Sequence, residues 1–119
     1  MGTFTVQVEV SGADAGPFTP VDLLVDTGAT YTVLPRDLLE ALGVEPHYHG
    51  EFGLADGTVV ERDVGRVWVR FENRLEHTFV VFGEDSLLGA VTLEELNRIV
   101  DPIGQRLVPV TALMKRVAA

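Results

Sequence analysis

Residues 23–30 of the chain read Leu23-Leu24-Val25-Asp26-Thr27-Gly28-Ala29-Thr30. The continuous apolar start of this stretch predicts the end of a strand that is buried on both faces. An acid directly after such a strand is costly to desolvate, so Asp26 is expected to have a function. Thr27 can form local hydrogen bonds and Gly28 permits a tight turn of the backbone. The alternative is an ordinary turn, because Asp, Thr and Gly are common turn residues.

Outward from this stretch, the dominant hydrophobic period is two, which is typical of half-buried strands. The alternation predicts seven or eight short strands in an all-β fold with one or two short helices. Asp56-Gly57 between apolar flanks indicates a hairpin. The expected strands and hairpin cover residues 4–10, 21–25, 31–34, 52–60, 64–71, 77–82 and 106–110.

Two short helices interrupt the strands. Pro35 suits the first position of a helix, and Gly43 supplies a left-handed stop for it. Thr92 and Glu95 have the spacing of a capping box, which predicts a second helix over residues 92–100. Asp101-Pro102 is expected to end that helix.

Composition limits the classes of function. The chain has 119 residues, 9 basic and 18 acidic side chains, a net charge of −9 and no cysteine. This predicts one domain over residues 1–119, with a core of about 3–110 and a tail of 111–119. The negative charge argues against nucleic acid and anionic membranes as partners. Without cysteine, disulfides and thiol chemistry are excluded. With no signal peptide or membrane span visible, a cytoplasmic location is expected.

Residues 24–29 resemble the active-site signature of retroviral-type aspartic proteases, the retropepsins. The family's second element, two apolar residues and a glycine, is matched by Leu87-Leu88-Gly89. A glycine-containing flap hairpin between the two is matched by residues 53–60, with Ala55-Asp56-Gly57 at its tip. The resemblance covers nearly the whole chain and implies a closed, barrel-like acid protease fold with a flap.

The resemblance assigns roles to four residues of the first element. Asp26 matches the catalytic aspartate, and Thr27 matches the threonine whose hydroxyl bonds across the dimer to its twin's loop. Gly28 matches the glycine whose backbone lies against substrate, and Ala29 matches the small residue beside the catalytic pair. Thr30 and Ala90 depart from the pattern, because many viral enzymes carry an Asp and a basic residue there, paired in a salt bridge.

The chemistry of such proteases needs two carboxyl groups that share one proton. The chain offers a single Asp-Thr-Gly, so the resemblance implies a two-fold homodimer in which Asp26 meets its symmetry mate. The predicted function is hydrolysis of peptide bonds in a peptide or protein substrate, without metal or cofactor. The alternative is a catalytically silent dimerisation or peptide-binding module on the same fold.

Three other features allow competing interpretations. His47, His49 and Glu51 share one face of an extended segment and could hold zinc, with His77 as a further ligand, but a solvated polar loop is favoured. The acidic surface favours solubility, with steering of basic substrates as the alternative. Trp68, out of phase with its valine neighbours, is expected to pack on the opposite sheet face or at a dimer interface.

Overall fold

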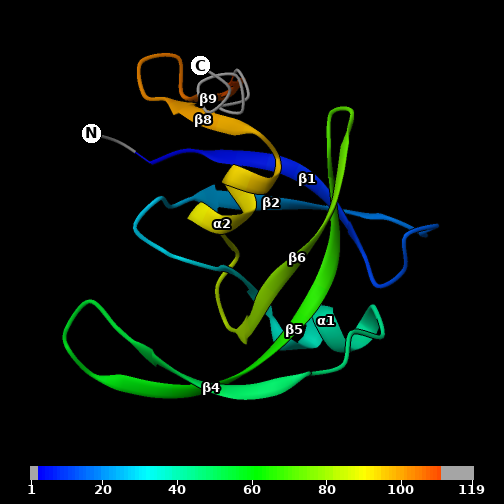
Figure 1. Cartoon of the computed structure of the whole chain (residues 1–119), viewed down its shortest axis with the longest axis vertical. Coiled ribbons are helices and arrows are strands. Elements are labelled where there is room, and N and C mark those ends of the chain that lie inside the picture. The colour runs from blue at the N-terminus through cyan, green and yellow to red at the C-terminus, as the bar shows by residue number, and fades with distance from the viewer. Residues whose placement is uncertain (1–2, 111–119) are drawn as a thin grey trace, which may run out of the picture.

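The computed structural model describes residues 3–110, which form nine strands and two short helices (Figure 1). No helix in this range is long and apolar enough to cross a membrane. The strands are β1 (Thr5–Ser11), β2 (Thr19–Val25), β3 (Thr32–Pro35), β4 (Tyr48–Gly53), β5 (Val59–Phe71), β6 (Arg74–Gly83), β7 (Leu87–Leu88), β8 (Arg98–Asp101) and β9 (Arg106–Pro109). The helices are α1 (Arg36–Ala41) and α2 (Ala90–Glu95).

Seven strands form one sheet that closes on itself. Their order is β1-β2-β7-β3-β6-β5-β4, and β1 also pairs with β5, with Val10 opposite Val69. All the strands of this order except β4 therefore form a ring, and each of these six strands has a neighbour on both sides. This arrangement confirms the expected barrel-like, all-β fold.

The interior of the ring is filled by alternate residues of its strands. Val8 and Val10 of β1 and Val67 and Val69 of β5 are almost completely buried. Leu39 of α1 joins them, as do two leucines at α2, Leu93 and Leu96. The period-two pattern in the sequence is thus the core face of these strands.

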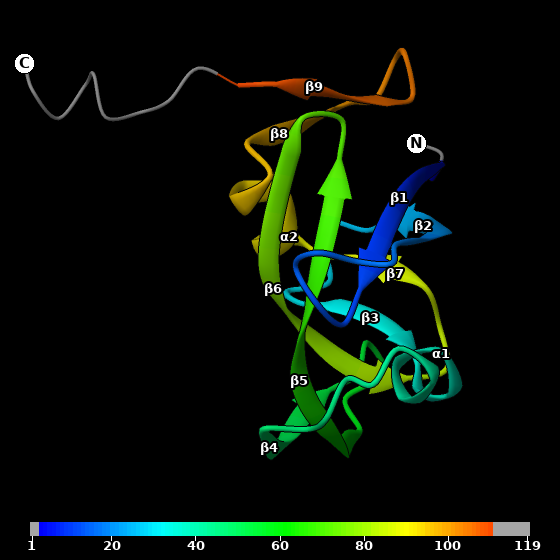
Figure 2. The same cartoon turned by 90° about the vertical axis from the view of Figure 1, so that its right-hand side faces the viewer.

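Two hairpins extend from opposite ends of the barrel (Figures 1 and 2). The β4–β5 hairpin lies at one end, and β8 with β9 forms a separate two-stranded sheet at the other. β5 is 13 residues long and belongs to both the barrel and the hairpin, so the expected segments 52–60 and 64–71 are joined by one continuous strand. The expected tail, 111–119, lies outside the described residues.

The prediction for the second helix was wrong at both ends. α2 begins at Ala90, with Gly89 as its N-cap, and no side chain caps it. Asn97 then takes a φ of +62°, and the following residues form β8 instead of continuing the helix. The capping box fails because the Thr92 hydroxyl is buried and bonded elsewhere. For the first helix, Pro35 is the N-cap rather than the first helical residue, and Gly43 ends it at a φ of +77°, as expected.

Three buried threonines link the elements around α2. The Thr92 hydroxyl lies 2.6 Å from that of Thr32 on β3 and 2.8 Å from that of Thr78 on β6. Thr32 Oγ1 also accepts a hydrogen bond from the Gly89 N–H at 3.1 Å. Each hydroxyl is fully buried, so each depends on the others for its hydrogen bonds.

Replacing Thr92 with valine keeps the shape of the side chain and removes the shared hydroxyl. We expect Thr92→Val to lower the free energy of unfolding by about 1–3 kcal/mol, because two buried hydroxyls lose a partner. Chemical denaturation measures this difference. Thr5→Val, at an exposed position of β1, is the control and should change stability by less than about 0.5 kcal/mol. Equal effects would mean that the threonine network contributes nothing.

Candidate active site

Asp26 lies directly after β2, where the chain leaves the barrel core. Val25 is 6% exposed, whereas Asp26 is half-buried and Thr27 is exposed. The Asp26 N–H donates to the Leu88 carbonyl at 3.0 Å, and its Oδ1 accepts from the Gly28 N–H at 3.0 Å. The loop therefore holds this carboxylate by one oxygen, and the turn expected at Gly28 is present.

The second predicted element lies beside the first. β2 and β7 pair in parallel, with Leu24 opposite Leu87 and Val25 opposite Leu88. Beyond this pair, the Ala90 N–H donates to the Ala29 carbonyl at 2.8 Å. The structure thus brings residues 26–29 and 87–89 together across a long stretch of sequence.

Gly89 is required by the closeness of these two loops. A Cβ atom at this position would collide with the Tyr31 carbonyl group and with the Thr32 nitrogen. A side chain there would push the loops apart, so only glycine fits.

Backbone hydrogen bonds connect the two loops at Thr30 and Ala90, the positions that depart from the viral pattern. The Val91 N–H donates to the Thr30 carbonyl at 3.0 Å, next to the bond between Ala90 and Ala29. The Thr32–Thr92–Thr78 network supports the same loops from below. The sequence did not single out these threonines as part of the site. The signal that could have found them is a polar residue, Thr32 or Thr78, at a position expected to face the core in β3 and in β6.

An open hollow of about 330 Å³ borders Asp26. It is lined by the start of the described chain, the Asp26 loop and the β8–β9 hairpin: Thr3, Phe4, Val25, Asp26, Thr27, Val100 and Pro102. The β8–β9 hairpin therefore lies next to the carboxylate. Figure 1 shows the chain leaving β2 between this hairpin and the β4–β5 hairpin.

The predicted flap is the β4–β5 hairpin, with Ala55, Asp56 and Gly57 at its tip. The Leu54 N–H donates to the Thr58 carbonyl at 2.8 Å, and Gly57 has a φ of +89°. Asp56 Oδ1 accepts from the Thr58 hydroxyl at 2.7 Å and from the Thr58 N–H at 3.0 Å. The hydroxyl contact in particular lowers the pKa of Asp56. The positive φ expected at Gly57 is confirmed.

One face of the flap contacts the segment that follows the Asp26 loop. The Phe52 ring of β4 meets the Tyr31 ring edge-on, with 6.2 Å between centroids. Tyr31 also packs against Phe79 of β6 at 5.8 Å. These contacts identify the flap face that is turned towards the Asp26 loop.

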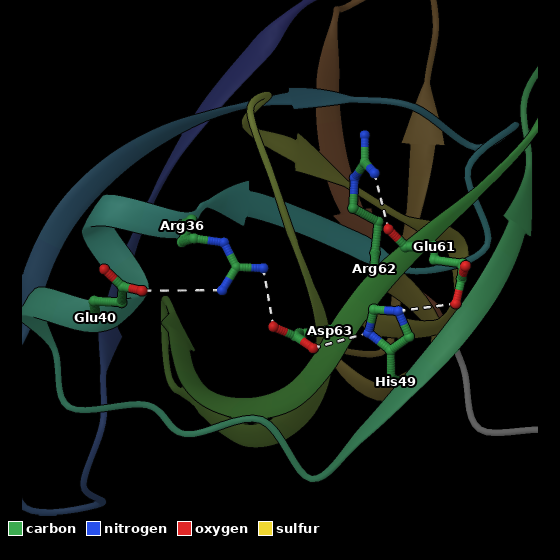
Figure 3. A network of polar contacts seen from close by, with 6 residues as sticks. All are labelled: Arg36, Glu40, His49, Glu61, Arg62 and Asp63. Atoms are coloured by element: carbon green, nitrogen blue, oxygen red, sulfur yellow. Dashed lines mark hydrogen bonds and ion pairs between the residues drawn. The ribbon is translucent and has the colours of Figure 1, made fainter.

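The opposite flap face carries a charged network around His49 (Figure 3). His49 Nδ1 lies 3.0 Å from Asp63 and Nε2 lies 3.1 Å from Glu61, both on β5. Arg36 of α1 also pairs with Asp63 at 3.0 Å. The hydrogen bond to Asp63 raises the pKa of His49, and the same bond lowers the pKa of Asp63.

The candidate zinc ligands do not gather. Residues 3–110 contain no group of three side chains able to hold a metal ion. Both ring nitrogens of His49 face carboxylates of β5 instead of His47 or Glu51. His77 stacks on Trp68, with 4.4 Å between ring centroids, and its pKa is lowered chiefly by burial. Trp68 thus packs on the sheet face opposite its valine neighbours.

Comparison with known proteins agrees with this geometry. A family model described as aspartyl protease matches residues 6–93, so the chain belongs to that family. Among solved structures it is similar to EIAV protease complexed with the inhibitor HBY-793, with a TM-score of 0.62 and 25% sequence identity. That match covers 90% of this chain and 93% of the other. No curated protein matches the chain. The retropepsin-like resemblance is confirmed.

Two flap glycines provide a matched test of the hairpin tip. Neither Gly53 nor Gly57 has any atom within 4 Å of an added Cβ, but only Gly57 has a positive φ. Gly57→Ala should destabilise the turn by about 1 kcal/mol and speed amide exchange there about fivefold. Gly53→Ala should leave exchange unchanged. Hydrogen exchange across residues 54–58 makes the comparison, and equal effects would exclude backbone strain as the cause.

The His49 network predicts that the local stability of the flap base depends on pH. Its pKa is raised above 6.5, so the charged bridge to Glu61 and Asp63 is complete below that pH and is lost as pH rises through the raised value. Amide exchange in β4, corrected for its intrinsic pH dependence, should therefore be slower at about pH 5.5 than at about pH 9. His49→Gln should abolish the difference, whereas His47→Gln should keep it. A difference that survives His49→Gln would contradict this assignment.

Proposed function

We propose that the protein is an aspartic endopeptidase that works as a homodimer, with the Asp26 carboxyls of two copies forming the catalytic pair. The observation that carries the proposal is the position of Asp26 beside an open hollow: its backbone N–H donates to the Leu88 carbonyl, and its carboxylate accepts from the Gly28 N–H. Membership of the aspartyl protease family supports the same chemistry.

One copy supplies half of the machinery. The mechanism needs one carboxyl to take a proton from water and the other to donate to the scissile carbonyl oxygen. The chain has one Asp-Thr-Gly, so a second copy must supply the other carboxyl. Thr27 is exposed next to Asp26, which leaves its hydroxyl free to bond to the partner's loop.

The flaps would cover an extended peptide in the dimer. Main-chain groups of the peptide would pair with the flap and the Asp26 loop, and pockets on alternate sides would take its side chains. Closure over the peptide would exclude water other than the attacking molecule. The Phe52–Tyr31 contact supports the assignment of the face that would meet the peptide.

Replacing Asp26 with asparagine tests the proposal directly. Asp26→Asn keeps the size of the side chain and removes the group that shares the proton, so peptide cleavage should fall at least about 100-fold. Asp22→Asn, an exposed acid on β2, is the control and should cleave like the wild type. Initial rates on a peptide mixture, with chelator present, give the comparison. Cleavage within tenfold of wild type would exclude Asp26 as the catalytic acid.

The same variant separates the enzyme from a silent module. Sedimentation of Asp26→Asn should still show a dimer, and specific activity of the wild type should fall on dilution as dimers dissociate. A wild-type dimer that binds peptides and cleaves none would support the silent module instead. A monomer with full turnover would exclude the shared site.

A further inference from the structure

The flap face turned towards the Asp26 loop carries a cation near its base. Side chains alternate along β5, and Val60 lies opposite Phe52 while Arg62 lies opposite Gly50. Because Phe52 contacts Tyr31, this face looks onto the segment that follows Asp26. We call Gly50, Phe52, Val60 and Arg62 the inner flap face. In Figure 3 the Arg62 side chain projects to the other side of β5 from His49 and Asp63.

Arg62 differs from the other arginines of residues 3–110 in its contacts. Arg66 lies over the Phe79 ring at 4.1 Å. Arg62 donates only to the carbonyl of its neighbour Glu61, at 2.8 Å. The arginines that pair with a carboxylate within 4.0 Å are Arg36, Arg70, Arg74, Arg98 and Arg106. Within residues 3–110, no carboxylate lies within 4.0 Å of the Arg62 guanidinium, although the chain has 18 acidic residues.

The space beside Arg62 suits a side chain from outside the protomer. Its cross-strand neighbour is Gly50, so no side chain of β4 lies directly opposite it. A Cβ at Gly50 would stand 3.3 Å from the Phe52 ring and 3.4 Å from the Tyr48 ring, so two aromatic rings border the gap. Arg62 itself is half-buried. Apolar walls beside a guanidinium strengthen its attraction for a carboxylate.

We propose that Arg62 is a specificity-determining residue that binds an acidic side chain, Asp or Glu, of a peptide substrate held under the flap. The guanidinium offers two parallel N–H donors that match a carboxylate, which a neutral amide side chain does not reproduce. The proposal rests on the proposed endopeptidase function and names its class of substrate.

This preference is opposite in sign to the one that net charge alone suggests. A charge of −9 steers basic peptides, but such long-range attraction is screened beyond about 8 Å at physiological salt. Steering changes the association rate for every cationic peptide and depends little on one residue. Contact with Arg62 acts at one peptide position only, so the two effects are separable.

The experiment uses pairs of peptides that are identical except at one position, where one member has Glu and the other has Gln. This position is moved in turn to each site around the scissile bond. The measured quantity is the ratio of kcat/KM for the two members of each pair. Wild-type protein should prefer Glu at least about tenfold at one position. Arg62→Gln should reduce that ratio to about one, and Arg62→Lys should keep part of it. Arg70→Gln, which removes the same charge at the far end of β5, is the matched control and should keep the full ratio.

The outcomes separate this inference from the proposed function. Cleavage with no Glu preference at any position, or with a preference that survives Arg62→Gln, would overturn the role of Arg62 and leave the protease intact. A preference for Lys over Gln that fades with added salt in every variant would favour steering instead. If no peptide is cleaved, the proposed function fails, and binding of the same pairs to the Asp26→Asn protein decides the inference. Equal binding of Glu and Gln peptides would then overturn it.

Discussion

The parallel pairing of β2 with β7 is the constraint on which the site depends. Parallel strands cannot be joined by a tight turn, so the chain between them must make a long excursion before it returns. That excursion contains β3, α1, the flap and β6. When it closes, the Leu88 carbonyl meets the Asp26 N–H, and the two predicted loops become one surface. The carboxylate is thus positioned by the closure of the barrel itself.

The flap is an extension of the barrel and has a distinct chemistry on each face. β5 continues from the barrel wall into the hairpin, so the base of the flap belongs to the barrel and its tip extends beyond it. On one face, His49 joins Glu61 and Asp63; these contacts are exposed, and each contributes little stability. On the other face, Phe52 packs against Tyr31, and Arg62 pairs with no carboxylate of the part of the chain that the structure describes. The exposed ionic contacts and the aromatic contacts therefore lie on opposite faces of the flap.

The loops around Asp26 are supported without ions. Thr30 and Ala90 occupy positions where related viral enzymes carry a salt bridge, and here adjacent backbone bonds connect the same loops. Beneath them, the hydroxyls of Thr32, Thr78 and Thr92 satisfy one another in the core. Neutral hydroxyls are less costly to bury than charges, so this support is compatible with a dry interior.

The sequence by itself determined the strand-rich class, the Asp26 turn, the second Gly89 element and the flap tip at Gly57, because period-two patterns and turn residues are local signals. It placed a helix at residues 92–95 correctly but extended it to residue 100, where pairing with β9 makes a strand of residues 98–101. Tertiary structure alone decided that Thr92 bonds to Thr32 and Thr78, and that Arg62 and His49 lie on opposite faces of the flap. The catalytic role of Asp26 stays a prediction. The physical reason for this division is that burial and partners depend on residues distant in sequence, which only the closed barrel brings together.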